Sequence, residues 1–274
     1  MKKILSVLLV LCMVFALAAC GSKEPAATTQ APTTEAPTTE APTTEAPTEA
    51  PTGAVESEGT VMTHEEYVAA ELDTPVCVET YVQACQGWWE NKITVYAQSE
   101  DGAYFIYNME CAEEAAAKLE PGTKIRVSGY KGEWSGEVEI LDATFEILEG
   151  SYIAEAKDVT DLLGKDELID HQNEKITLTG LTVAPSTVEG SEEEFAFLYN
   201  WDGSGAAGNN NDLYFNVTDG DNTYTLTVES YLCGESTDVY QTVTGLKVGD
   251  TIDIEGFLYW YNGAQPHVTS VTVK

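Results

Sequence analysis

Basic side chains are scarce in this chain of 274 residues. Its 13 Lys and Arg stand against 46 Asp and Glu, a formal net charge of −33, and Arg126 is the single arginine. Contacts to phosphates supply much of nucleic-acid affinity and need clustered Lys or Arg. The acidity therefore predicts that nucleic acid is disfavoured as a partner, whereas cationic ligands or metal ions are less so. It equally suits a protein whose acids only keep its surface soluble.

Catalytic signatures are lacking as well. The three histidines His64, His171 and His267 lie in unrelated contexts, and no G-x-S-x-G, H-E-x-x-H or phosphate-loop motif occurs. Turns at Asp202-Gly203 and Asp219-Gly220 could offer oxygen ligands to calcium, but without the spacing of a calcium loop. The sequence therefore predicts no enzyme, no catalytic residue, no cofactor and no metal site.

The only long apolar run stands at the N-terminus. Lys2 and Lys3 precede the uncharged segment 4–19, whose end Leu-Ala-Ala runs into Cys20. A spanning helix needs about 20 apolar residues, and this run is shorter. It resembles the bacterial lipobox, which implies a signal peptide over 1–19 and a lipid on Cys20. We expect an extracytoplasmic protein attached to the cell membrane; a plain membrane anchor or secretion is the alternative.

Residues 20–59 are rich in Pro, Thr, Ala and Glu, and Ala-Pro-Thr-Thr-Glu repeats between Ala31 and Thr52. No large apolar residue occurs there before Val55. Such a segment cannot bury enough surface to offset its ordering entropy. We predict a disordered linker, which when extended reaches roughly 100 Å from the anchor.

An internal repeat predicts two domains, 60–150 and 151–274. The segment 119–129 is followed by Trp134 and Gly136, and the segment 246–256 is followed at the same spacing by Tyr261 and Gly263. Each copy predicts a turn, an alternating strand and a tight hairpin. The shared position of Trp134 and Tyr261 suggests that both rings stabilise the fold.

Three strands, a helix or loop and a closing hairpin are expected in each half, which is the order of the OB-fold. The fold class predicted is all-β with short helices, as two tandem five-stranded OB-fold-like barrels after the linker. Short helices are expected at 63–72, 112–118 and 159–169. The second half departs from the pattern by a long insertion at 185–211, which is functional or disordered.

The chain resembles the tandem OB-fold surface lipoproteins of Gram-positive bacteria, because it combines the internal repeat with the predicted signal peptide and linker. For such barrels the resemblance implies a nucleic-acid-binding label, which the acidity disfavours. The four cysteines after Cys20 are expected to be free thiols, although Cys111 could pair with Cys77 or Cys85. Those two share a strand face about 26 Å apart, too far to bridge each other.

Aromatic residues mark the candidate ligand surface, in the loops where OB-folds bind oligonucleotides or oligosaccharides. Stacking on sugar rings suits them, although alternation along a strand turns about half of the rings inward. We predict a non-enzymatic binding or presentation module for a glycan or a protein partner; an enzyme accessory module and an inert spacer are the alternatives. The candidate ligand-binding residues are Trp88, Trp89, Trp134, Tyr259, Trp260 and Tyr261.

Overall fold

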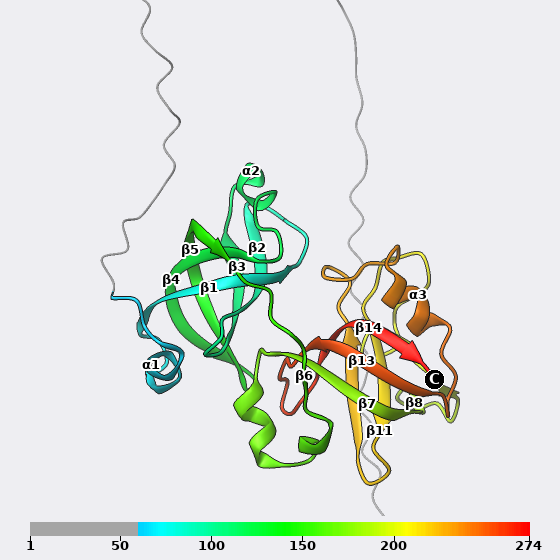
Figure 1. The fold of residues 1–274 in the computed structure, drawn as a ribbon. Helices are drawn as coiled ribbons and strands as arrows, with labels where there is room; N and C mark the ends of the chain where they lie inside the picture. The colour runs from blue at the N-terminus through cyan, green and yellow to red at the C-terminus, as the bar shows by residue number, and fades with distance from the viewer. Residues whose placement is uncertain (1–59) are drawn as a thin grey trace, which may run out of the picture. The chain divides into compact units, whose positions relative to one another are not determined.

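The computed structural model describes residues 60–274; the predicted signal peptide, Cys20 and the linker lie outside them. All described residues belong to one compact unit, Pro51–Lys274. It contains two closed five-stranded barrels, so the predicted fold class is confirmed (Figure 1). Within residues 60–274 no helix is both long and apolar enough to cross a bilayer.

The first barrel has the strand order β1-β2-β3-β5-β4 and closes where β4 pairs with β1. The parallel pairing of β3 with β5 is short, because only Phe105 and Ile106 face partners there. The elements are α1 (His64–Ala69), β1 (Pro75–Cys85), β2 (Lys92–Gln98), β3 (Ala103–Glu110), α2 (Glu113–Ala116), β4 (Thr123–Trp134) and β5 (Glu137–Ser151).

Alternating aliphatic residues fill this barrel. Val78, Val95, Ile106 and Ile125 are completely buried in one cluster, since every second side chain of a strand faces the same side. The turn Ser135-Gly136 joins β4 to β5 with positive φ at both residues, as the predicted two-residue hairpin requires.

The second barrel is formed by β7, β11, β12, β14 and β13, and closes where β11 pairs with β7. Short strands β6 and β10 extend its sheet at the edges. The elements are β6 (Lys157–Asp158), η1 (Thr160–Leu162), η2 (Asp166–His171), β7 (Lys175–Ala184), β8 (Ser186–Thr187), β9 (Glu194–Phe195), β10 (Leu198–Tyr199), β11 (Leu213–Thr218), β12 (Thr223–Val228), α3 (Asp238–Thr244), β13 (Thr251–Phe257) and β14 (His267–Val273).

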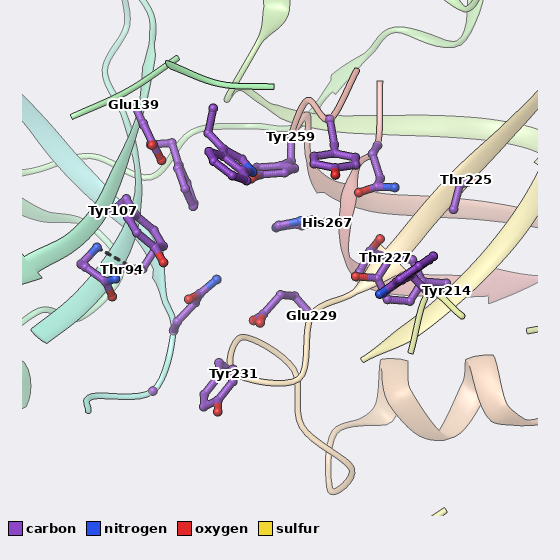
Figure 2. A pocket seen from close by; sticks show the side chains of 18 of the residues that line it. Thr94, Tyr107, Glu139, Tyr214, Thr225, Thr227, Glu229, Tyr231, Tyr259 and His267 are labelled. Carbon is purple, nitrogen blue, oxygen red and sulfur yellow. Dashed lines mark hydrogen bonds between the residues drawn. The ribbon is translucent and has the colours of Figure 1, made fainter. Parts of the chain in front are cut away.

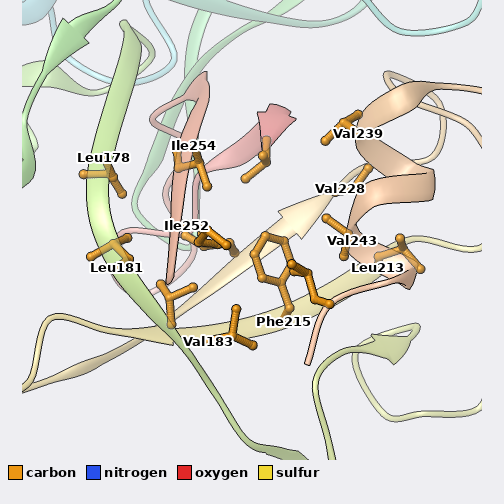
Figure 3. Close-up of a cluster of buried hydrophobic side chains, with 14 of the residues drawn as sticks. Leu178, Leu181, Val183, Leu213, Phe215, Val228, Val239, Val243, Ile252 and Ile254 are labelled. Carbon is orange, nitrogen blue, oxygen red and sulfur yellow. The ribbon is translucent and has the colours of Figure 1, made fainter. Parts of the chain in front are cut away.

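Figure 3 shows the core of the second barrel, in which Phe215 lies among aliphatic side chains from the surrounding strands. The helix α3 adds Val239 and Val243 to the same cluster. Thr237 caps α3, because its hydroxyl accepts a hydrogen bond from the backbone N–H of Tyr240. In the chain, α3 lies between β12 and β13, the position at which the OB-fold order predicts a helix or loop.

Three local expectations change. The segment 159–169 contains two 3₁₀ turns, η1 and η2, rather than an α-helix. The strand β13 ends at Phe257, so residues 258–266 form a longer connection than the tight hairpin predicted at Asn262-Gly263. The insertion 185–211 contains the strands β8, β9 and β10 and buries Leu198, so it is ordered.

The thiols of Cys77, Cys85, Cys111 and Cys233 are free, as expected. Burial raises the pKa of the Cys111 thiol to about 11, and that of Cys233 likewise to about 11. Both thiols therefore stay protonated and weakly nucleophilic at neutral pH.

An aromatic cleft as the candidate functional site

Side chains from both barrels meet in a small aromatic cluster. Tyr96 of β2 stacks on Phe257 of β13, with ring centroids 4.6 Å apart. Backbone groups add to the junction: the N–H of Gly87 donates to the carbonyl of Tyr231 over 2.8 Å, and the N–H of Asn262 donates to that of Ser135 over 2.7 Å. These contacts fix the residues that border the cleft beside them.

The cleft has a volume of about 1180 Å³ and is lined by residues of both barrels (Figure 2). That exceeds the 300–1,000 Å³ usual for small-molecule pockets, so there is room for several sugar-sized units. The first barrel contributes the rings of Trp89, Phe105, Tyr107 and Trp134. The second contributes those of Tyr214, Tyr231, Tyr259 and Tyr261, and the insertion adds Trp201.

Three of these rings are largely exposed: Trp89, Trp134 and Trp201 have 67%, 61% and 76% of their surface in contact with solvent. Large apolar rings usually become buried when a chain folds. Exposed apolar groups that gather around a concave surface are typical of binding sites. The three tryptophans are therefore suited to contact a ligand rather than to stabilise the barrels.

His267 lies within the cleft lining and is nearly buried. Burial lowers its pKa to about 3, so the imidazole is neutral at physiological pH. Gln86 Nε2 donates to the Tyr96 hydroxyl over 3.2 Å, and the hydroxyl forms a hydrogen bond of 2.6 Å with His267 Nδ1. The imidazole also stacks on Tyr259, with centroids 4.1 Å apart.

Two carboxylates line the cleft, Glu139 on β5 and Glu229 after β12, and Lys92 is the one lysine in its lining among the described residues. Burial raises the pKa of Glu139 to about 6. Burial, with the neighbouring charge of Asp212, raises that of Glu229 to about 7. Glu229 Oε2 accepts a hydrogen bond of 2.9 Å from the N–H of Leu232. The cleft therefore becomes more negative as pH rises through 6 to 7.

Four of the six candidate residues from the sequence line the cleft: Trp89, Trp134, Tyr259 and Tyr261. Trp134 and Tyr261, which we expected to stabilise the fold, are both exposed there. Bringing these rings together requires both barrels, and ligand contact by them is still a prediction.

Trp88 and Trp260 lie elsewhere. Trp88 packs on the core of the first barrel, and its Nε1 donates to the carbonyl of Cys111 over 2.8 Å. Trp260 packs on the core of the second barrel, and its ring lies so close to Gly136 that a Cβ there would overlap it. In each pair of neighbouring residues, 88–89 and 260–261, one ring packs on a core and the other lines the cleft.

Sequence reasoning missed several residues of the cleft. Tyr107 follows Phe105 by two positions in β3, a spacing that places both on one face. No sequence pattern distinguishes Glu139 and Glu229 from the many other acidic residues of the chain. Trp201 lies in the insertion 185–211, which the sequence predicts to be either functional or disordered. Within residues 60–274, no group of three or more His, Cys, Asp and Glu side chains could hold a metal ion.

No protein-family model and no curated protein sequence matches the chain. Solved structures do match, at low identity. A HINb domain is 12% identical, covers 74% of this chain and 98% of its own, and gives a TM-score of 0.33. A murine DNA-binding protein bound with double-stranded DNA is 13% identical over 72% of this chain and 94% of its own, at 0.32. At these identities the likeness concerns the fold alone.

One expectation about partners is corrected by these matches. The acidity predicted that nucleic acid is disfavoured, yet the similar solved structures include the murine protein on DNA and a HINa domain in complex with 20-bp double-stranded DNA. The prediction that set nucleic acid aside is therefore wrong and is withdrawn. The architecture shows two OB-fold-like barrels, and nucleic acid belongs among the ligands to be tested.

Proposed function

We propose that this protein is a lipid-anchored surface protein that binds a glycan, without catalysis, in the aromatic cleft. The observation that carries the proposal is the presence of three exposed tryptophans around one concave surface. A flat ring can stack on the apolar face of a sugar while polar neighbours bind its hydroxyls.

Polar groups suited to hydroxyls stand beside the rings. Asn108, Asn216 and Gln265 line the cleft and can both donate and accept hydrogen bonds. His267 adds a neutral imidazole, and Thr227 adds a buried hydroxyl that has no partner within residues 60–274. A glycan rich in hydroxyl groups can satisfy such a mixed set.

The proposed location rests on the sequence. A charged start, a short apolar run and small residues before Cys20 support a lipidated N-terminus, and the Pro- and Thr-rich segment supports a spacer. The Cys20→Ser variant of the whole chain should then move from the membrane fraction to the soluble fraction. Retention of this variant in the membrane would contradict lipid attachment at that residue.

Binding is tested with the compact unit 51–274, which contains both cores. Neutral oligosaccharides, single-stranded and double-stranded oligonucleotides are titrated while tryptophan fluorescence is recorded. We expect a saturable change with a neutral oligosaccharide, because exposed tryptophans border the cleft. The oligosaccharide should be recovered uncut after prolonged incubation.

Two variants locate the site. Trp134→Ala and Trp201→Ala should each weaken glycan binding about tenfold, since truncating a central aromatic contact costs more than about 1 kcal/mol. Tyr130→Ala removes an exposed ring that does not line the cleft and should leave binding unchanged. Binding of an oligonucleotide but of no glycan, lost in the same two variants, would replace the proposal with nucleic-acid binding.

A further inference from the structure

The carboxylate of Glu139 is unusual among the acids of this chain. Only 7% of the residue is exposed, and it lines the cleft. Within residues 60–274 no hydrogen bond or ion pair to its side chain is found, and burial alone accounts for its shifted pKa. Buried charges are normally paired, because desolvation otherwise destabilises them.

The nearest basic residue on the adjacent strand is already engaged. Lys131 lies in β4 and pairs with Ile140 of β5. Its ammonium donates to the backbone carbonyls of Val68 and Ala70, over 2.7 and 2.9 Å. Lys131 lies on the same face of the sheet as Ile140, opposite to the face of Glu139, so within residues 60–274 Glu139 has no ion pair.

Aromatic rings surround this carboxylate. Phe105 is its direct partner in the parallel pairing of β3 with β5. Phe105 in turn contacts Tyr259 edge-on, with centroids 5.3 Å apart, and stacks on Tyr107 at 6.3 Å. Burial raises the pKa of the Tyr259 phenol, and the charges of Glu137 and then Glu139 add smaller contributions. Ring faces next to a carboxylate attract an ammonium group by cation–π and Coulomb interactions together.

A second carboxylate and an unpartnered hydroxyl border the same cleft. Figure 2 labels Thr227, which lies in β12, and Glu229, which directly follows that strand. The Thr227 hydroxyl is buried and has no partner among the described residues. Both are available to hydroxyl or ammonium groups of an extended ligand.

Resting on the proposed glycan-binding function, we propose that the cleft prefers amino sugars, with a protonated amino group of the glycan held by the Glu139 carboxylate among Phe105, Tyr107 and Tyr259. A neutral sugar would stack on the tryptophans but leave Glu139 unpaired. A basic sugar pairs the buried carboxylate and binds more tightly for that reason.

The test compares oligosaccharides of equal length that differ in charge. The unit 51–274 is titrated in a calorimeter at pH about 6.5 with glucosamine, N-acetylglucosamine and glucose oligomers, since Glu139 is mostly ionised there and the weakly basic amine of an amino sugar is still substantially protonated. We expect the glucosamine oligomer to bind at least tenfold more tightly than the two neutral oligomers.

Variants assign that preference to one residue. Glu139→Gln keeps the size of the side chain and should lose the tenfold preference. Glu167→Gln changes an exposed acid outside the cleft and should keep it. A circular-dichroism spectrum and a urea midpoint like those of the wild type show that the Glu139→Gln variant is folded.

The outcomes separate the two proposals. Equal binding of basic and neutral oligomers would overturn the amino-sugar preference and leave the glycan function standing. A preference that survives in Glu139→Gln would overturn the role of this carboxylate. Absence of binding by every oligomer would overturn the glycan function itself, and the amino-sugar preference with it.

Discussion

The stability of the fold should fall as pH rises, because of one buried carboxyl at the barrel junction. Glu137 is completely buried. Its Oε2 accepts hydrogen bonds from the N–H of Trp260 over 2.8 Å and from Gln172 Nε2 over 3.2 Å, whereas Oε1 has no partner within residues 60–274. Burial, which outweighs these hydrogen bonds, raises the pKa of Glu137 from its ordinary 4.5 to about 8.

The direction of the effect follows from the protons bound in each state. Between pH 4.5 and about 8 the folded state keeps the proton of Glu137 while the unfolded state loses it. Stability therefore declines over this range and levels off above it. Each pKa unit is worth about 1.36 kcal/mol, so the decline reaches at most about 5 kcal/mol.

Glu137→Gln removes the titration and keeps the shape of the neutral acid. We expect the variant and the wild type to be about equally stable at pH about 5. At pH about 9 the variant should be more stable by several kcal/mol. Other titratable groups lie near Glu137: Glu139, with a pKa of about 6, and the phenols of Tyr67, Tyr96 and Tyr259. Both proteins contain them, so their own contributions to the pH dependence of stability largely cancel in the difference between variant and wild type.

Urea unfolding of the unit 51–274 at a series of pH values measures this difference in stability. Unfolding is monitored by both fluorescence and circular dichroism, to check that the two signals report a single transition. The exposed Glu167→Gln variant is the control and should follow the wild type at every pH. A stability difference between Glu137→Gln and wild type that does not change with pH would refute the reasoning, because the buried carboxyl would then not titrate with folding.

Three further predictions concern stability and are checked by urea unfolding. Thr63→Ala removes the capping box in which Thr63 Oγ1 accepts from the N–H of Glu66, and should cost about 1 kcal/mol, whereas no loss would mean that α1 adds nothing. Ile125→Ala leaves a cavity in the first core and should cost about 2–5 kcal/mol. Gly256→Ala places a Cβ against the His267 carbonyl and should cost about 1–3 kcal/mol; wild-type stability would show that the strands can separate.

The barrels could be predicted from the sequence because their signals are local. Gly129 and Gly256 recur in the repeat since each stands where its strand meets its hairpin partner too closely for a side chain, next to a shift of register. The capping box at Thr63 was likewise readable from four consecutive residues. The 3₁₀ turns at 160–171 were mistaken for a helix, because apolar spacing does not distinguish the two over such short stretches.

The cleft could be predicted only in part, because it depends on residues far apart in the chain. Neighbouring rings such as Trp88 and Trp89 face different surroundings, and alternation alone does not say which of the two lies inward. Glu139 lines the cleft together with Tyr259, which is contributed by the other barrel. No local pattern marks one acid among 46 as buried and unpartnered.

The repeat itself explains how two barrels come to share one cleft. Trp134 and Tyr261 hold the same position in the two copies, and both line the cleft with 61% and 47% of their surfaces exposed. The N–H of Asn262 donates to the carbonyl of Ser135, so the two corresponding hairpin regions are joined directly. A ring that only stabilised a barrel would be buried in its own copy. The duplicated position therefore places one aromatic side chain from each barrel where a single ligand can contact both.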